Sequence, residues 1–313
     1  DAVRLEAAYA STNQNPLAAC AITGTGFPID RERTTELLGF DRTTGNTYGS
    51  IATVDYLLES VSATAVMLVG LGRVVQDLLL WCTSEFGYLR LPDGFVQGSS
   101  IMPQKRNPVA LEHARAIGSK AAGQAAAVML AAHNTPFGDI VDTEDDLQPL
   151  VAQMFKDAAR AVALVAAAMA GAEFDVGKLA ARAGQHWITV TELADTLVRD
   201  RGLPFTTAHT IASRLVAVSP TSGDKSVATL VREISREMTG HEIAFSDAQL
   251  AEILSPTHFV EVRKTHGGPS PSETARALGV SKQALAGDEK WLAAARARLT
   301  AAEESLRKAA ASL

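Results

Sequence analysis

Residues 53–82 read TVDYLLESVSATAVMLVGLGRVVQDLLLWC, a long and mostly apolar stretch. Two sets of residues recur at heptad spacing, the first at Val54, Val61, Leu68, Val75 and Cys82 and the second at Leu57, Thr64, Leu71 and Leu78. As a helix the stretch would span roughly 45 Å. Polar side chains interrupt it at Glu59, Arg73, Gln76 and Asp77, which argues against a membrane span. We therefore predict a core helix of a helical bundle.

Two further long helices are predicted downstream of this stretch. One begins with Asn107 as N-cap and Pro108 at the first helical position, and the other spans about 144–170. Upstream, a short helix over 31–38 interrupts an irregular segment that runs from residue 11 to residue 49. Three long helices joined by long loops predict an elongated bundle.

The sequence changes character near residue 174, where short helices separated by Gly and Pro begin. The last helix is expected at about 288–310. The predicted fold class is thus all-α, with an elongated long-helix bundle at 1–172 followed by a smaller helical C-terminal domain at 173–313. Because the chain starts as if in mid-helix, we expect the bundle domain to be incomplete at its N-terminus.

Composition excludes several function classes. The net charge of −6 argues against a general nucleic-acid surface, and no Cys/His grouping has metal-ligand spacing. We predict no nucleic-acid partner, no membrane and no metal. Mild acidity is normal for a cytoplasmic enzyme, which sets our expectation of location.

The chemistry-bearing segment is GSSIMPQKRNP, at residues 98–108. It is a loop of hydroxyl, amide and cationic groups that leads directly into a helix N-terminus, and such a terminus suits an anion. Lys105 adds a full positive charge, and Asn107 can donate from its side chain unless capping uses it. Ser99 and Ser100 are candidate bases or nucleophiles. The physical alternative is a solvated linker whose cations only complement nearby acids.

The loop closely resembles the GSSxMPxKxN signature of the aspartase/fumarase superfamily. Three other segments resemble its argininosuccinate lyase branch, namely residues 15–32, residues 193–209 and residues 259–269. The resemblance covers essentially the whole chain and leaves out the family's N-terminal domain and first bundle helix. It implies a fumarate-releasing lyase that uses no cofactor.

The resemblance also implies roles for the loop residues. Ser99 matches the base that removes a proton from the carbon next to a carboxylate, and Lys105 and Asn107 match the groups that stabilise the developing charge. Ser100 and Met102 match substrate-binding positions beside them. Glu112, one turn into the next helix, matches a Glu that orients a His from an upstream segment.

The identity of the amine leaving group depends on residues 134–149. Where argininosuccinate lyases carry a Tyr, a Gln and a Lys, this chain places Asp139, Glu144 and Leu147. One interpretation is simply an acidic first turn of a helix. The other is a pocket in which Asp139 and Glu144 bind an amine, as in lyases acting on N-substituted aspartates such as ethylenediamine-disuccinate.

We therefore predict a carbon–nitrogen lyase that releases fumarate from an N-substituted aspartate, with a small dicarboxylate as substrate. The resemblance further implies a homotetramer with active sites shared between subunits. Argininosuccinate lyase proper is the close alternative. A structural protein of the crystallin type, recruited from the same branch, is the alternative of another class.

Overall fold

The computed structural model describes residues 1–139, 141–219 and 223–312, without the side chains of 141–144. By its contacts the chain forms two compact units, 1–174 with 287–313 and 175–286. Helices dominate both units, which confirms the all-α prediction. The segment 287–313 belongs to the first unit, where Trp291 packs edge-on against Tyr9 and Arg298 pairs with Asp41 at 3.0 Å. The sequence analysis placed that segment in the second domain.

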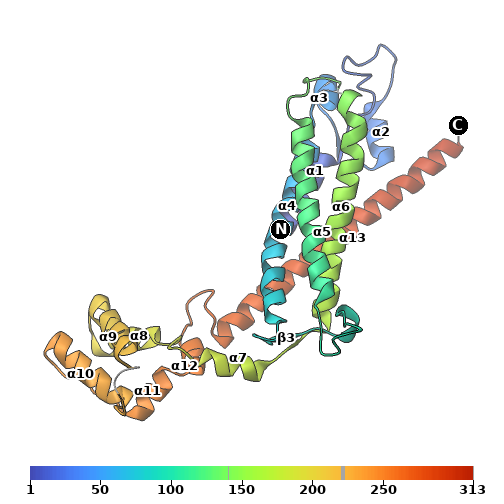
Figure 1. Cartoon of the computed structure of the whole chain (residues 1–313). Helices are drawn as coiled ribbons and strands as arrows, with labels where there is room; N and C mark the ends of the chain where they lie inside the picture. The colour runs from blue at the N-terminus through green and yellow to red at the C-terminus, as the bar shows by residue number, and fades with distance from the viewer. Residues whose placement is uncertain (140, 220–222, 313) are drawn as a thin grey trace. The chain divides into compact units, whose positions relative to one another are not determined.

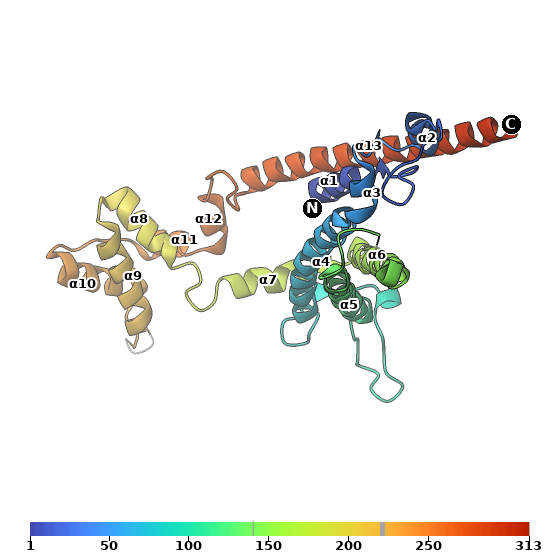
Figure 2. The same ribbon diagram turned by 90° about the horizontal axis from the view of Figure 1, so that it is seen from above.

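The first unit is built on three long helices, α4 (Asp55–Trp81), α5 (Val109–Ala132) and α6 (Val141–Ala170), which lie side by side (Figures 1 and 2). Its shorter helices are α1 (Ala2–Thr12), α2 (Arg31–Leu38), α3 (Thr47–Ala52) and the 3₁₀ turn η1 (Asp93–Phe95). Strands β1 (Gln14–Asn15) and β2 (Arg42–Thr43) pair in parallel, and β3 (Leu89–Arg90) and β4 (Glu173–Phe174) pair antiparallel.

The heptad predicted for α4 is confirmed by its burial. Val61, Leu68 and Val75 are at most 3% exposed and pack against the two neighbouring long helices. Two side chains from the other heptad set, Thr64 and Leu78, are buried as well. Burial of this stripe, rather than helix propensity alone, is what holds a helix of this length in place.

The other face of α4 stays apolar and exposed. Val66, Val69, Val74 and Leu80 are between 43% and 59% exposed. Among the described residues, α4 alone is long and apolar enough to cross a membrane, yet only 28% of its most apolar window is buried in this chain. This face of α4 is thus an exposed apolar surface of the chain.

The second unit has its own core of buried side chains, contributed mainly by three helices and completed by a fourth. Its helices are α7 (Val176–Ala183), α8 (Thr191–Arg201), α9 (Phe205–Val218), α10 (Val227–Thr239), α11 (Asp247–Ile253) and α12 (Pro256–Glu261). The last helix, α13 (Pro271–Ala311), has residues in both units. It begins well before the predicted start near residue 288.

Candidate active site

The signature loop is closed at its neck by backbone pairing. The N–H of Gln97 donates to the carbonyl of Asn107 at 2.9 Å, and the N–H of Asn107 donates back at 3.0 Å. Helix α5 begins two residues later, with Pro108 at the cap position and no side-chain cap. The prediction that Asn107 caps this helix is wrong, because its backbone is held by the pairing with Gln97.

The two serines of the loop differ in their surroundings. The Oγ of Ser99 accepts hydrogen bonds from the backbone N–H of Ile101 at 3.2 Å and of Met102 at 3.1 Å. Two N–H dipoles aimed at one oxygen stabilise negative charge on it. Ser99 is partly buried, whereas Ser100 and Met102 are exposed. The local geometry therefore favours Ser99 over Ser100 as the group that can carry negative charge.

A cavity of about 660 Å³ lies between this loop, the end of α4 and the start of α5. It brings together Lys105, Asn107 and Glu112, three of the residues singled out from the sequence. Ser99, Ser100 and Met102 belong to the same loop but do not line the cavity. Arg106 and Arg115 line it as well. The cavity therefore holds three cationic side chains, those two and Lys105, and one carboxylate, that of Glu112. With the N-terminus of α5 adjacent, the cavity suits a dicarboxylate.

Arg106 and Arg115 are the site residues that the sequence analysis missed. The Nη1 atom of Arg115 donates to the Oε1 atom of Gln76 on α4 at 2.8 Å. Arg106 forms an ion pair with Asp93 at 2.7 Å. A signal was present for both: Arg106 lies inside the signature loop, and Arg115 lies three residues after Glu112, on the same face of α5.

Asp139, predicted with Glu144 to bind the leaving group, lines a second cavity of about 260 Å³ together with Leu147, which stands where the branch places a Lys. Other walls of this cavity come from Ser50, Tyr56 and Gln148. Leu147 is only 2% exposed, while Asp139 is exposed. Glu144 falls within the range of α6, but its side chain lies outside the described residues. The lining of this cavity thus includes the carboxylate of Asp139, the apolar side chain of Leu147 and the hydroxyl groups of Ser50 and Tyr56.

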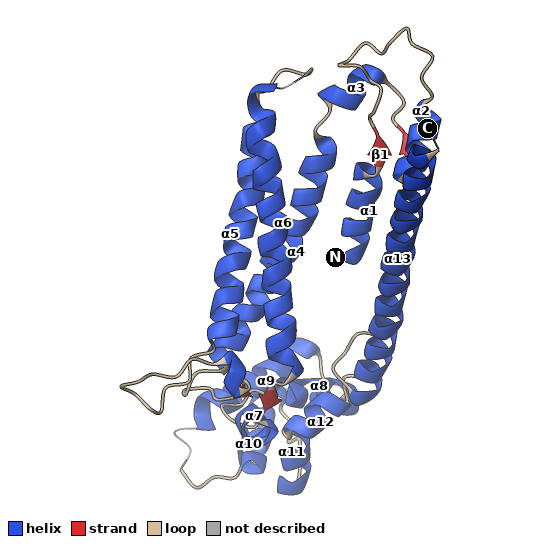
Figure 3. Cartoon of the chain, turned by 90° about the vertical axis from the view of Figure 1, so that its right-hand side faces the viewer, coloured by secondary structure: helices blue, strands red, loops and turns tan. Residues whose placement is uncertain are grey.

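The two cavities lie at opposite ends of the bundle. The signature loop follows the C-terminal end of α4, and the second cavity is lined by residues at and before its N-terminal end. Figure 3 shows α3, which contributes Ser50 and Ile51 to that cavity, at the N-terminal end of α4. A helix of 27 residues is roughly 40 Å long. One chain therefore does not bring Lys105 and Asp139 to the same substrate.

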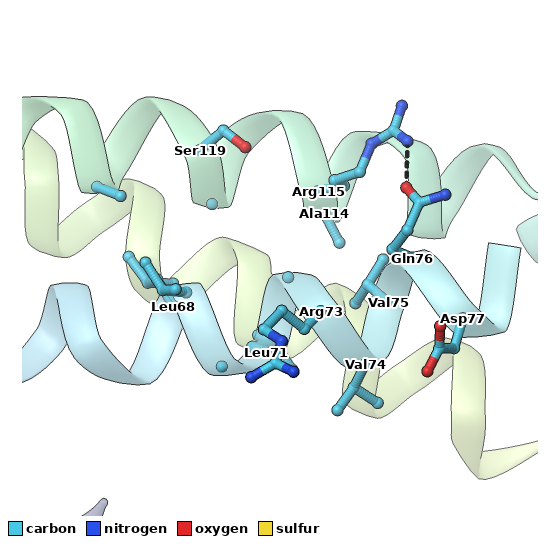
Figure 4. A pocket seen from close by; sticks show the side chains of 15 residues that line it. Leu68, Leu71, Arg73, Val74, Val75, Gln76, Asp77, Ala114, Arg115 and Ser119 are labelled. Atoms are coloured by element: carbon cyan, nitrogen blue, oxygen red, sulfur yellow. Dashed lines mark hydrogen bonds between the residues drawn. The ribbon is translucent and has the colours of Figure 1, made fainter.

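A third and larger cavity, of about 880 Å³, lies along the middle of the bundle between α4 and α5 (Figure 4). Its lining from α4 combines apolar residues such as Leu71 and Val74 with the charged residues Arg73 and Asp77. Arg115 and Gln76, which form a hydrogen bond across α5 and α4, both line it. It belongs to the exposed apolar face of α4 and holds none of the residues predicted to be catalytic.

Two family models match the chain, one described as Lyase over residues 1–123 and one described as Argininosuccinate lyase C-terminal over residues 187–261. Argininosuccinate lyase 2 of Agrobacterium fabrum is 38% identical over 87% of the chain. Argininosuccinate lyase of Methanoculleus marisnigri is 36% identical over 98% of it. The chain spans 54% and 62% of these two relatives.

Solved structures give the same result. An EDDS lyase variant with bound fumarate matches with a TM-score of 0.87 and 30% identity, over 97% of this chain and 61% of that one. A crystal structure of EDDS lyase in complex with formate matches equally well. The chain belongs to the aspartase/fumarase superfamily, in its argininosuccinate lyase branch.

Proposed function

We propose that the full-length protein is a carbon–nitrogen lyase that releases fumarate from an N-substituted aspartate. The observation that carries this proposal is the cationic cavity at the start of α5, which is lined by Lys105 and Asn107 from the same loop that contains Ser99. The relatives named as argininosuccinate lyases and the EDDS lyase structure with bound fumarate support the reaction class.

The chemistry follows from where charge develops. Ser99 takes a proton from the carbon next to a carboxylate, and the electron pair moves onto that carboxylate as a dianionic intermediate. The adjacent C–N bond then breaks, its electrons leave with the amine, and fumarate remains. Lys105 and Asn107 stabilise the extra negative charge, which is the largest contribution such a site can make. Glu112 lines the same cavity. Its proposed role is to orient a His from the segment upstream of this chain.

The leaving group is proposed to be a cationic amine that binds at the cavity of Asp139 and Leu147. The carboxylate of Asp139 attracts an ammonium group, and Leu147 offers no hydrogen bond to a distal carboxylate. A site that cannot pair a polar group of its ligand binds that ligand poorly. These two residues therefore favour a small diamine over arginine.

A complete site requires more than one copy of the chain. The separation of roughly 40 Å along α4 is removed if a second copy runs antiparallel, because its Asp139 cavity then lies near the first copy's loop. The exposed valines of α4 supply an apolar surface for that contact. We propose a homotetramer with shared active sites. A cytoplasmic location stays a prediction from composition.

The leaving group can be tested by adding amines to fumarate. With the full-length protein, the loss of fumarate absorbance is followed with ethylenediamine, arginine and ammonia, and kcat/KM is compared. We expect a higher value for ethylenediamine than for arginine. A clear preference for arginine would establish the alternative, argininosuccinate lyase proper, which the names of the curated relatives favour. No consumption with any amine would refute the lyase assignment.

A further inference from the structure

Arg106 ties the signature loop to a segment outside it. Its Nη1 atom lies 2.7 Å from Oδ1 of Asp93, and its Nη2 atom donates to the carbonyl of Leu91 at 3.1 Å. Leu91 is 2% exposed and belongs to the core of the first unit, so its carbonyl is a fixed point. Asp93, two residues further on, is the first residue of the turn η1. The guanidinium thus contacts the backbone carbonyl of Leu91 and the side-chain carboxylate of Asp93 with separate nitrogens.

This tether lies between the two residues that bind the substrate carboxylate. Lys105 and Asn107 are the chain neighbours of Arg106. The backbone N–H of Lys105 donates to Met102 at 3.0 Å, and that of Asn107 is held by the neck of the loop. The returning limb of the loop is therefore fixed from inside by backbone bonds and from outside by the Arg106 side chain.

We propose that Asp93 and Arg106 form a positioning pair for the lyase reaction, which holds Lys105 and Asn107 in line with the substrate carboxylate. Asp93 lines a separate cavity with Arg90, Gly171 and others, so it acts through Arg106 and not on the substrate. Arg106 also lines the cationic cavity, which makes Asp93 the cleaner residue to change.

The pair is an alignment device rather than a source of stability. The Asp93 side chain is 84% exposed and that of Arg106 is 41% exposed, and exposed ion pairs contribute little to the free energy of unfolding. The hydrogen bond from Arg106, together with its charge, lowers the pKa of Asp93 below its ordinary value. Asp93 is consequently ionised, and the contact intact, across the neutral range.

The inference rests on the proposed function, and the experiment separates the two with a readout that needs no catalysis. In the full-length protein, Asp93→Asn and Arg106→Gln are compared with Glu36→Gln, which breaks an equally short exposed pair with Arg33 on α2. Amide hydrogen exchange of residues 102–107 should accelerate in the first two variants and stay unchanged in the third. Unchanged exchange in Asp93→Asn would overturn the positioning pair even if the protein is an active lyase.

Activity gives the second readout. Because misplacement of a binding group by about 1 Å can cost up to about 100-fold in rate, kcat/KM should fall about tenfold or more in Asp93→Asn and Arg106→Gln, with the melting temperature unchanged. The double variant should lose no more than the worse single variant, since both remove one contact. Arg106→Lys, which keeps the charge but not the planar fork, should recover part of the rate. Losses that multiply in the double variant would mean independent roles and would refute the pair.

Discussion

Ser99 and Ser100 carry the same side chain one position apart, and their different surroundings decide which can act as a base. Ser99 receives two backbone N–H groups at its Oγ, and Ser100 is exposed beside it. The surroundings of Asn107 also determine what its side chain can do. Its backbone N–H and carbonyl pair with Gln97, and its side chain does not cap α5. The amide of Asn107 is thereby available for a ligand.

Replacing Ser99 with Ala in the full-length protein should abolish proton removal while leaving the fold intact. Loss of a general base costs about 10²–10⁴-fold, so kcat should fall by at least about 100-fold. Ser100→Ala is the matched control, and it should retain most of the activity. Steady-state kinetics measure both, and the reverse pattern would show that Ser100 is the base.

The contact between α5 and α6 contains a buried carboxylate. Asp157 on α6 has a side chain only 1% exposed, with Lys120 of α5 at 2.8 Å and Arg160 at 3.3 Å. Hydrogen bonds from Gln153 and Lys120, helped by the nearby charges, lower the pKa of Asp157 to about 2. Asp157 therefore joins two of the long helices through its ionised form.

A pH dependence follows from this carboxylate. Its pKa in the folded protein lies below the ordinary value of 3.8, so its contribution to stability is present above about pH 4 and is lost as the pH falls toward about 2. Asp157→Asn should lower the melting temperature at pH 7 and flatten the decline over that acid range. Thermal unfolding followed by circular dichroism measures this, with Asp145→Asn, an exposed acid on α6, as control. Equal melting curves for both variants would contradict the role of Asp157.

The sequence predicts the long helices well because their signals are local. The heptad of α4 and the Gly39 that ends α2 with a φ of 75° place those elements within two residues. Helix α13 was predicted too short, since Gly279 and Gly287 each disfavour a helix by about 1 kcal/mol and yet the helix continues through both. Helix α3 was missed because it is only six residues long.

The sequence predicts the residues of the signature loop, but it does not predict the contacts that this loop makes with other segments. The residue types of the loop are visible in its sequence, and the structure brings Lys105, Asn107 and Glu112 together. The contact of Arg106 with Asp93 depends on the path of the loop back past β3, which no periodicity in the sequence encodes. Pairs of this kind become visible only when the fold is known.

At the scale of the chain, the described residues place Lys105 and Asp139 in two separate cavities and leave one face of α4 apolar and exposed. Lys105 and Asp139 lie at opposite ends of a helix roughly 40 Å long, and Val69 and Val74 on that helix are more than half exposed. The proposed antiparallel packing of α4 against another copy would account for both facts.

We therefore expect a stable tetramer of the full-length protein in light scattering at micromolar concentration. In a background lacking Cys20 and Cys82, a mixture of Gln104→Cys and Asp139→Cys subunits should be joined by a short bismaleimide. The pair Gln104→Cys and Glu36→Cys serves as control, because Glu36 lies outside both cavities. A stable monomer, or equal cross-linking of the two pairs, would count against shared sites.

The most direct test of the account is elimination in the forward direction. Full-length protein is incubated with ethylenediamine-disuccinate and with argininosuccinate, and the release of fumarate and of free amine is quantified for the wild type and for Ser99→Ala. We predict that the wild type releases one fumarate for each C–N bond broken, faster with the diamine substrate, and that Ser99→Ala releases almost none. Fumarate release by Ser99→Ala at the wild-type rate, or no release by the wild type from either substrate, would contradict the account.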